Sequence, residues 1–320
     1  MKSITFICPY FGKLPEAQFP LWLQSCAYNP SIKWIIFTDD TTEYDYPTNV
    51  EKVQVSFEWL KEYIQSKFEF KVSLDTPYKL CDFKPTYGYV FKDYLQDSDY
   101  WGYCDISDTI FGNLRKFLTD NVLTSDKVMF LGHMTLYKNS NNINSVFMNS
   151  EKCGKPIERI LGVAENMAFD ENPMYGIRKI FTILGYSSYR VDKMYDDISP
   201  LRYAFQLSCY DQDYKQYYKK KVPIIFEWRN GSLYEFSLKE GELSKRELGY
   251  VHFQKRKMNN PFKKKDVRQF LIVPNKFIEN NKMITTRCVE DYGKDRMFYY
   301  PFFKLKWDAL IYKLSHLGKD

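Results

Sequence analysis

Short apolar runs alternate with amphipathic stretches over about the first 135 residues. Apolar, β-branched runs predict strands at residues 3–8, 33–40, 50–57 and 99–105. The intervening stretches 14–28, 57–68 and 78–95 have a helical pattern, in which Ser56 can cap the second helix and Pro85 breaks the third. Alternation of this kind predicts an α/β fold with a mixed, mostly parallel sheet flanked by helices.

The pattern changes in the second half of the chain. An apolar run at 127–137 predicts one further strand, and 247–258 predicts a late strand. Helices are expected at 113–123, 141–149 and 155–162. Two β-rich arms flank Asn230-Gly231, the preferred dipeptide of a tight hairpin turn, so residues 222–236 should form a hairpin at an antiparallel edge of the sheet. The pattern shows no convincing domain boundary, and we expect one main domain over 1–260 with a basic, aromatic extension over 261–320.

Composition supports a large folded core. The chain has 320 residues, of which 44% are hydrophobic and 18% aromatic, which is far from a disordered composition. The seven cysteines include no CxxC pair, which argues against a zinc knuckle and fits a reducing compartment. No apolar run is long enough to span a membrane, and the N-terminus lacks a signal-peptide pattern, so a cytoplasmic location is expected.

The net charge of +6 is concentrated in a basic tract over residues 255–282. Such a tract favours phosphates, nucleic acid or anionic lipid as a partner. The end of the chain, residues 298–320, alternates aromatic, aliphatic and lysine residues. This extension either packs on the domain or lies peripherally on an anionic membrane surface.

An acidic turn follows the fourth predicted strand, in the sequence "WGYCDISDTIFGNL" at residues 101–114. Asp105 and Asp108 would repel one another unless a cation lay between them, and carboxylate oxygens suit Mg²⁺ or Mn²⁺. An ordinary turn, in which Asp bonds its own backbone, explains the same spacing. Polar turns also follow the first and second strands, and ligands bind at the carboxyl ends of strands in such sheets.

His252 follows the late strand in "YVHFQKRKM" and precedes Lys255 and Lys257. Imidazole is a good ligand for Mn²⁺-type ions, and the cations after it could hold phosphates. A purely structural histidine is an equal alternative.

Several segments together resemble a known family. "WGYCDISD" with a distant "VHFQKRK" resembles glycosyltransferases of the GT-A fold, which carry a DxD motif after a buried strand and often a late histidine. More closely, residues 8–40, 77–95, 99–114 and 130–139 look like bacterial capsule and O-antigen polysaccharide glycosyltransferases, similar to β-1,3-galactofuranosyltransferases. The match covers about residues 3–140 well and then thins.

The resemblance implies a role for particular residues. The metal ligands would be Asp105, Asp108 and His252. The usual motif is Asp-x-Asp, whereas position 107 is Ser, so either Asp108 or Ser107 with a water completes the site. The nucleotide sugar would contact a set of residues from five parts of the chain: Pro9, Tyr10, Phe11, Gly12, Lys13, Asp39, Lys79, Asp82, Lys84, His133, Lys255 and Lys257.

An inverting enzyme also needs a base, because the acceptor hydroxyl loses a proton as it attacks. The sequence "MAFDENPMYG" offers Asp170 and Glu171, which could equally be an acidic pair at a helix start. The resemblance favours one of them as the base.

These observations predict a metal-dependent glycosyltransferase that uses Mn²⁺ or Mg²⁺. It would transfer a hexosyl unit, with galactose or galactofuranose favoured, from a UDP-sugar to a glycan or lipid-linked oligosaccharide acceptor. A nucleotidyltransferase acting on sugar phosphates is one alternative, although "CPYFGK" is not a glycine-rich phosphate loop. A non-catalytic glycan- or nucleic-acid-binding protein is another, although we expect no nucleic-acid partner.

Overall fold

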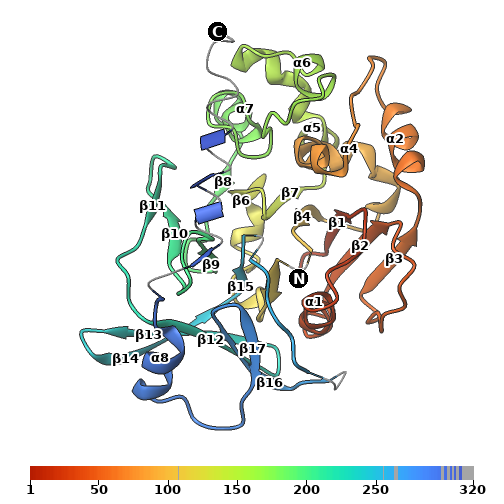
Figure 1. The fold of residues 1–320 in the computed structure, drawn as a ribbon. Helices are drawn as coiled ribbons and strands as arrows, with labels where there is room; N and C mark the ends of the chain where they lie inside the picture. Colours follow the sequence, from red (N-terminus) through yellow and green to blue (C-terminus); the bar gives the residue numbers. More distant parts are fainter. Residues whose placement is uncertain are drawn as a thin grey trace. The chain divides into compact units, whose positions relative to one another are not determined.

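A computed structural model describes residues 1–106, 108–254, 256–262, 266–296, 299–300, 303–304, 306–307 and 310–311. The chain forms two compact units (Figure 1). Unit 1 comprises residues 1–107 and 115–192, and unit 2 comprises 108–114 and 193–320. The boundary expected between residues 260 and 261 falls inside unit 2.

Unit 1 is built on a mixed sheet, sheet A, with the strand order β3-β2-β1-β4-β7-β6-β8. Strands β1 to β4 run parallel, whereas β7 is antiparallel to both β4 and β6, and β8 runs parallel to β6. The bounds are β1 Ile4–Pro9, β2 Ile32–Thr38, β3 Val50–Gln54, β4 Tyr100–Cys104, β6 Lys127–Leu131, β7 Met134–Lys138 and β8 Ser188–Tyr189. The predicted α/β class and mixed sheet are therefore confirmed.

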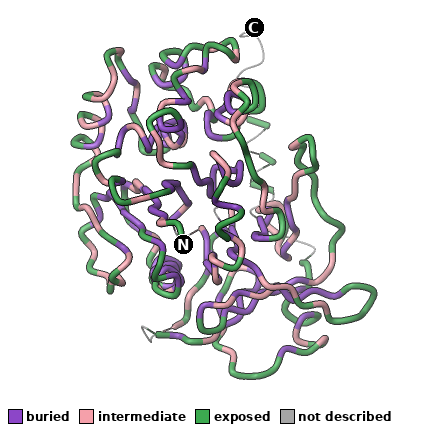
Figure 2. Tube along the Cα trace, turned by 180° about the vertical axis from the view of Figure 1, so that it is seen from behind, coloured by how far each residue is buried: buried purple, intermediate pink, exposed green. Residues whose placement is uncertain are grey.

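Both faces of sheet A carry apolar side chains, because successive residues of a strand point to opposite sides. On one face Trp34 of β2 packs edge-on against Trp22, with 6.3 Å between the ring centroids. On the other face lies the main core of unit 1, which joins Phe37 and Trp101 to residues of several helices. Figure 2 shows the inner strands of this sheet as mostly buried segments, whereas β3 and β8 at its two edges are more exposed.

Short helices surround sheet A in unit 1. Ser56 accepts a hydrogen bond from the Trp59 N–H, which confirms the predicted cap of α2. Pro20 lies in the first turn of α1, where it needs no hydrogen bond. The bounds are α1 Phe19–Ala27, α2 Phe57–Gln65, α3 Leu80–Phe83, α4 Tyr87–Val90, α5 Asn141–Asn144, α6 Glu158–Leu161 and α7 Ile177–Leu184, with the short 3-10 turns η1 Pro77–Lys79, η2 Lys84–Thr86, η3 Lys92–Tyr94 and η6 Val146–Cys153.

Two predictions for residues 113–137 are wrong. Residues 113–123 form the 3-10 turns η4 (Leu114–Lys116) and η5 (Val122–Thr124) and not one helix, since Thr119, Asp120 and Asn121 offer the backbone competing hydrogen bonds. Residues 127–137 form two antiparallel strands, β6 and β7, joined by a turn at Gly132 and His133. The sequence pattern did not indicate this turn, because both strands are buried on both faces and read as one continuous apolar run.

Unit 2 contains two further sheets. Sheet B has the order β11-β10-β9-β15-β5, in which β9 and β15 are parallel. Sheet C has the order β14-β13-β12-β16-β17 and is antiparallel throughout. The bounds are β5 Thr109–Phe111, β9 Tyr195–Ile198, β10 Leu207–Tyr210, β11 Gln216–Tyr218, β12 Ile224–Arg229, β13 Ser232–Lys239, β14 Glu242–Leu248, β15 Tyr250–His252, β16 Gln269–Val273, β17 Lys276–Glu279 and the helix α8 Thr286–Gly293.

The predicted hairpin at Asn230-Gly231 is confirmed. Both residues have positive φ, 45° and 81°, as the favoured two-residue turn requires. The hairpin lies in sheet C and not at the edge of the parallel sheet, which corrects its expected place. The predicted late strand at 247–258 corresponds to the end of β14, at residues 247–248, and to the short strand β15 at Tyr250–His252. Among the residues that the structure describes, no helix is both long and apolar enough to cross a membrane.

Candidate functional site

The carboxyl ends of β1, β2 and β4 lie side by side in sheet A, so the segments that follow them share one edge. After β1, the Gly12 N–H donates to Asp39 Oδ1 over 2.8 Å, and Gly12 has a φ of 94° that favours glycine. The neighbouring Asp40 carboxylate accepts the Leu14 N–H at 2.7 Å. The structure thus brings together the predicted loop over residues 9–13 and the predicted Asp39.

Asp105 directly follows β4, as predicted. Its Oδ1 lies 2.8 Å from Lys84 Nζ, and its N–H donates to the His133 carbonyl at 3.0 Å. The Asp105 side chain is 33% exposed, whereas that of Lys84 is 14% exposed. The Asp105 carboxylate, at the end of β4, is therefore partly exposed to solvent and also pairs with the largely buried Lys84 ammonium.

Lys84 is the centre of a larger group. Its Nζ donates to the Gly132 carbonyl at 2.8 Å and lies 3.9 Å from Asp170 Oδ2. The Gly132 N–H in turn donates to Glu171 Oε1. Lys84, Asp105, Asp170 and Glu171 therefore gather around the β6–β7 turn, and we call these four residues the carboxylate cluster.

The two acidic residues predicted as the base have different surroundings. Asp170 is buried, and its pKa is raised to about 8: burial is the largest cause, Lys84 lowers the pKa, and Glu171 and Asp105 raise it. Glu171 is exposed. Burial alone would lower the pKa of Lys84, but Asp105 and Asp170 hold the pKa well above its ordinary value. The cluster therefore combines a permanent cation with a carboxyl group that titrates near neutral pH.

The carboxylate cluster leaves no room for a side chain at Gly132. A Cβ atom there would lie 2.4 Å from Asp170 Oδ2 and 2.9 Å from Glu171 Oε1. Sequence reasoning missed Gly132, although a glycine inside a strand-like run is a signal for a close approach. The acidic pair is also not at a helix start, because α7 begins only at Ile177.

Lys79 and Asp82 are placed differently from the expectation. Their side chains are 2% and 0% exposed and pair at 2.8 Å. Lys79 Nζ also donates to the carbonyls of Ile160 and Glu165, and the Asp82 carboxylate accepts the N–H groups of Met167 and Phe169. Since Phe169 precedes Asp170, we assign this buried pair to holding the loop that carries Asp170 and not to lining a donor pocket.

Four more of the predicted residues complete this account. Lys13 is exposed and pairs with Glu16 at 2.5 Å. His133 is buried in the turn between β6 and β7. Ser107 and Lys255 lie outside the described residues.

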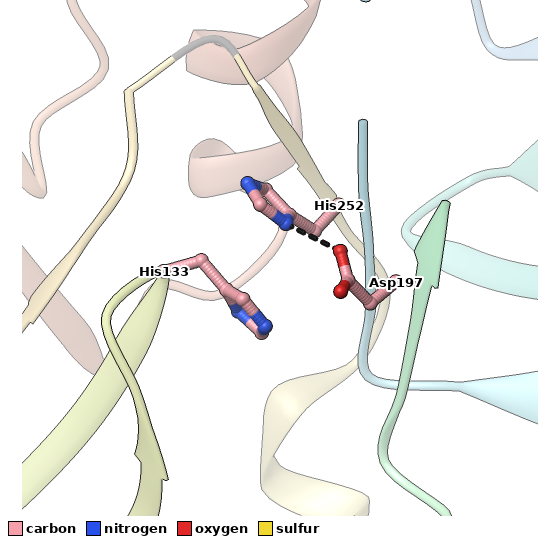
Figure 3. Close-up of side chains that lie close together, drawn as sticks. All are labelled: His133, Asp197 and His252. Carbon is pink, nitrogen blue, oxygen red and sulfur yellow. Dashed lines mark hydrogen bonds and ion pairs between the residues drawn. The ribbon is translucent and has the colours of Figure 1, made fainter. Parts of the chain in front are cut away.

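Asp108 and His252 belong to unit 2, where β5 and β15 bring them close. The Phe253 N–H donates to the Asp108 carbonyl at 2.7 Å, and His252 pairs with Thr109 across the two strands. On the other side of β15, His252 Nδ1 lies 2.7 Å from Asp197 Oδ1 (Figure 3). Gln254 Nε2 donates to the second oxygen of the same carboxylate.

Asp197 is a residue that the sequence did not reveal. It lies on β9, directly opposite His252 on the parallel strand β15. A carboxylate beside Nδ1 favours the tautomer in which Nδ1 carries the proton. Nε2 then has a lone pair that can bind a metal ion or accept a proton. Among the predicted phosphate contacts that follow, Lys257 is exposed.

Arg256, between the two predicted lysines, has a structural role. Its guanidinium donates to the carbonyls of Ser199, Arg202 and Tyr203 and to the Asn275 side chain. Burial lowers its pKa, and nearby tyrosines oppose that shift. This residue holds the segment after β9 in place within unit 2.

Comparison with known proteins gives one result. None of the curated proteins matches the sequence. One family, described as a family of unknown function (DUF6625), matches residues 6–281, which is most of the chain. The protein therefore belongs to the DUF6625 family.

Proposed function

We propose that the protein is a metal-dependent glycosyltransferase of the GT-A fold. It transfers a hexosyl unit, with galactose or galactofuranose favoured, from a UDP-sugar to a bacterial surface-glycan acceptor. One observation carries the proposal: Lys84 joins Asp105, which is 33% exposed at the carboxyl end of β4, to Asp170, which is buried and has a raised pKa. Carboxyl groups with such contrasting environments are typical of acid–base sites.

The donor nucleotide has a candidate place at the same edge. Residues 9–13 and Asp39 form one hydrogen-bonded turn after β1 and β2. Ligands of α/β sheets bind outside the carboxyl ends of the strands, where chain segments diverge. We assign this turn to the base and ribose of the nucleoside diphosphate.

Asp170 is our first choice for the base. In the proposed reaction the acceptor oxygen bonds to the anomeric carbon while the bond to the diphosphate breaks, with inversion. The hydroxyl proton passes to the Asp170 carboxylate, and the nucleoside diphosphate leaves. A pKa of about 8 suits this task, because a base works best when its pKa lies near the working pH.

The proposal keeps a divalent cation, because carboxylate oxygen and imidazole suit one as ligands. Asp105 supplies hard carboxylate oxygen in unit 1, and in unit 2 Asp108 and His252 remain proposed ligands, with Asp197 orienting the imidazole. Bound Mn²⁺ or Mg²⁺ would neutralise charge on the leaving diphosphate. The ion itself is a proposal that rests on the chemistry of these donors.

The acceptor and the location follow from the same proposal. A glycan or a lipid-linked oligosaccharide would provide the attacking hydroxyl, and the reaction would take place in the cytoplasm or at the inner face of the bacterial membrane. No nucleic-acid partner is proposed.

The test is calorimetry with UDP, GDP and dTDP, each with and without Mn²⁺, followed by hydrolysis assays with the corresponding sugars. We expect metal-dependent binding of UDP and slow hydrolysis of a UDP-hexose. Asp105→Asn should abolish both, whereas the matched control Asp97→Asn, an exposed aspartate of unit 1, should retain both. Failure of every nucleoside diphosphate to bind at millimolar concentration would refute the proposal.

A further inference from the structure

The β10–β11 hairpin of unit 2 ends in an exposed, basic and aromatic segment. Tyr217 and Tyr218 are 47% and 43% exposed, although successive residues of a strand face opposite sides. Strand β11 forms the edge of sheet B, and all its residues are exposed. Figure 2 shows the chain here as an exposed segment. We call residues 214–221 the basic ribbon.

Cations accompany these tyrosines. Lys215, Lys219, Lys220 and Lys221 are all exposed. The side chains of Lys219 and Lys220 form no ion pair with any residue that the structure describes. The basic ribbon thus presents aromatic rings with polar tips and long ammonium side chains on one short projection.

A pocket of about 250 Å³ lies at the end of the basic ribbon. Its apolar lining includes Phe205 and Pro223, and its charged lining includes Arg202, Lys221, Lys294 and Asp295. Asp295 lies 3.6 Å from Arg202 and 3.4 Å from Lys221, whereas Lys294 pairs with Asp291 at 3.4 Å, so three cations and one carboxylate line the pocket. This pocket suits an anionic group attached to an apolar body.

We propose that the basic ribbon docks unit 2 on an anionic lipid bilayer, with the pocket receiving a lipid headgroup phosphate. Tyrosine is enriched where proteins meet the membrane–water interface, because its ring is apolar and its hydroxyl stays hydrated. Lysine stems lie along apolar surface while the ammonium remains in water near lipid phosphates. The proposal goes beyond sugar transfer and stands whether or not the protein proves to be a transferase.

Protection of an edge strand does not explain the same features. Lysines alone keep an exposed edge from pairing with another chain. Two adjacent exposed tyrosines work against that purpose, since aromatic residues favour strand pairing. The combination with a cationic pocket points to a surface that is both anionic and partly apolar.

The test is co-sedimentation of the full chain with vesicles of phosphatidylglycerol and phosphatidylcholine, compared with phosphatidylcholine alone. We expect binding to the anionic vesicles that weakens with salt. Lys219→Glu with Lys220→Glu should reduce binding by more than about tenfold, because each lysine near an anionic surface contributes roughly a factor of five. Tyr217→Ser with Tyr218→Ser should also weaken binding, but without changing its salt dependence.

Two controls carry the same change of charge. Lys71→Glu with Lys152→Glu alters exposed lysines of unit 1 and should leave binding unchanged. Lys263→Glu with Lys264→Glu alters a second lysine run, outside the described residues, and should have a smaller effect than the change in the basic ribbon. Hydrogen exchange should show protection of residues 214–221 on vesicles. Equal binding by the 219/220 variant and the wild type, or protection of another segment alone, would overturn the proposal.

Discussion

The Gly132 N–H donates a hydrogen bond to Glu171, and this bond ties the loop that carries Asp170 to the turn between β6 and β7. The Gly132 carbonyl meanwhile accepts from Lys84. One residue without a side chain therefore holds two members of the carboxylate cluster and packs against a third. Its surroundings lead to the first prediction.

Replacing Gly132 with Ala should destabilise unit 1 by about 1–3 kcal/mol, the usual cost of overpacking. The new Cβ would meet Asp170 Oδ2 at 2.4 Å. Urea unfolding measures the loss. In an Asp170→Ala background the same change should cost less, because the clashing oxygen is gone, and an equal cost in both backgrounds would contradict the steric explanation.

Asp170→Asn should reduce the rate of the proposed transfer by a factor of about 100 or more, since the amide cannot accept the proton. Glu171→Gln should reduce the rate by less than about tenfold, because its amide oxygen can still accept the Gly132 N–H. Steady-state kinetics with a UDP-hexose distinguishes the two variants. The reverse ranking would make Glu171 the base and Asp170 a positioning residue.

Stability should fall as the pH rises from about 4 to about 8. Burial raises the pKa of Asp170 from 3.8 to about 8, so the native state keeps a proton that the unfolded state loses in this window. The free energy of unfolding should therefore decrease by up to about 1.4 kcal/mol per pH unit from this group. Asp170→Asn should remove this contribution, which urea unfolding at several pH values would reveal. An unchanged slope would show that Asp170 titrates normally.

Asp197→Asn should weaken Mn²⁺ binding by about 10–100-fold if His252 is a metal ligand, since an amide supports the imidazole less well than a carboxylate does. Calorimetry with Mn²⁺ alone measures the change. Asp213→Asn, an exposed aspartate of unit 2, is the matched control and should bind as the wild type does. Equal affinity in the two variants would remove His252 from the set of metal ligands.

Local patterns predicted those parts of the fold that depend on neighbouring residues. A few adjacent residues are enough to specify each of these features: the buried strands β1, β2 and β4, the Ser56 cap and the Asn230-Gly231 turn. Apart from β15, the strands of sheet B were missed, because they are short and β11 is fully exposed, so they carry little periodicity of their own.

For the candidate site, the sequence predicted which residues take part but not how each of them is buried. Asp105, Lys84 and Asp170 were named from separate motifs, and unit 1 brings them together. Which of Asp170 and Glu171 is buried could not be read from two adjacent acidic residues, because the burial depends on Gly132 and on the Lys79–Asp82 pair. Asp197 could not be predicted from the sequence, because its place beside His252 depends on the parallel pairing of β9 with β15, two segments far apart in the chain.

Strand β5 belongs to the sheet of unit 2, yet it lies between segments of unit 1 in the chain. During synthesis it leaves the ribosome long before its partner β15, so unit 2 must complete its assembly around a strand made much earlier. A truncated chain that starts at residue 193 would lack this strand and expose the edge of β15. Expressing the C-terminal part separately therefore requires a circularly permuted gene that restores residues 108–114, and not a simple cut.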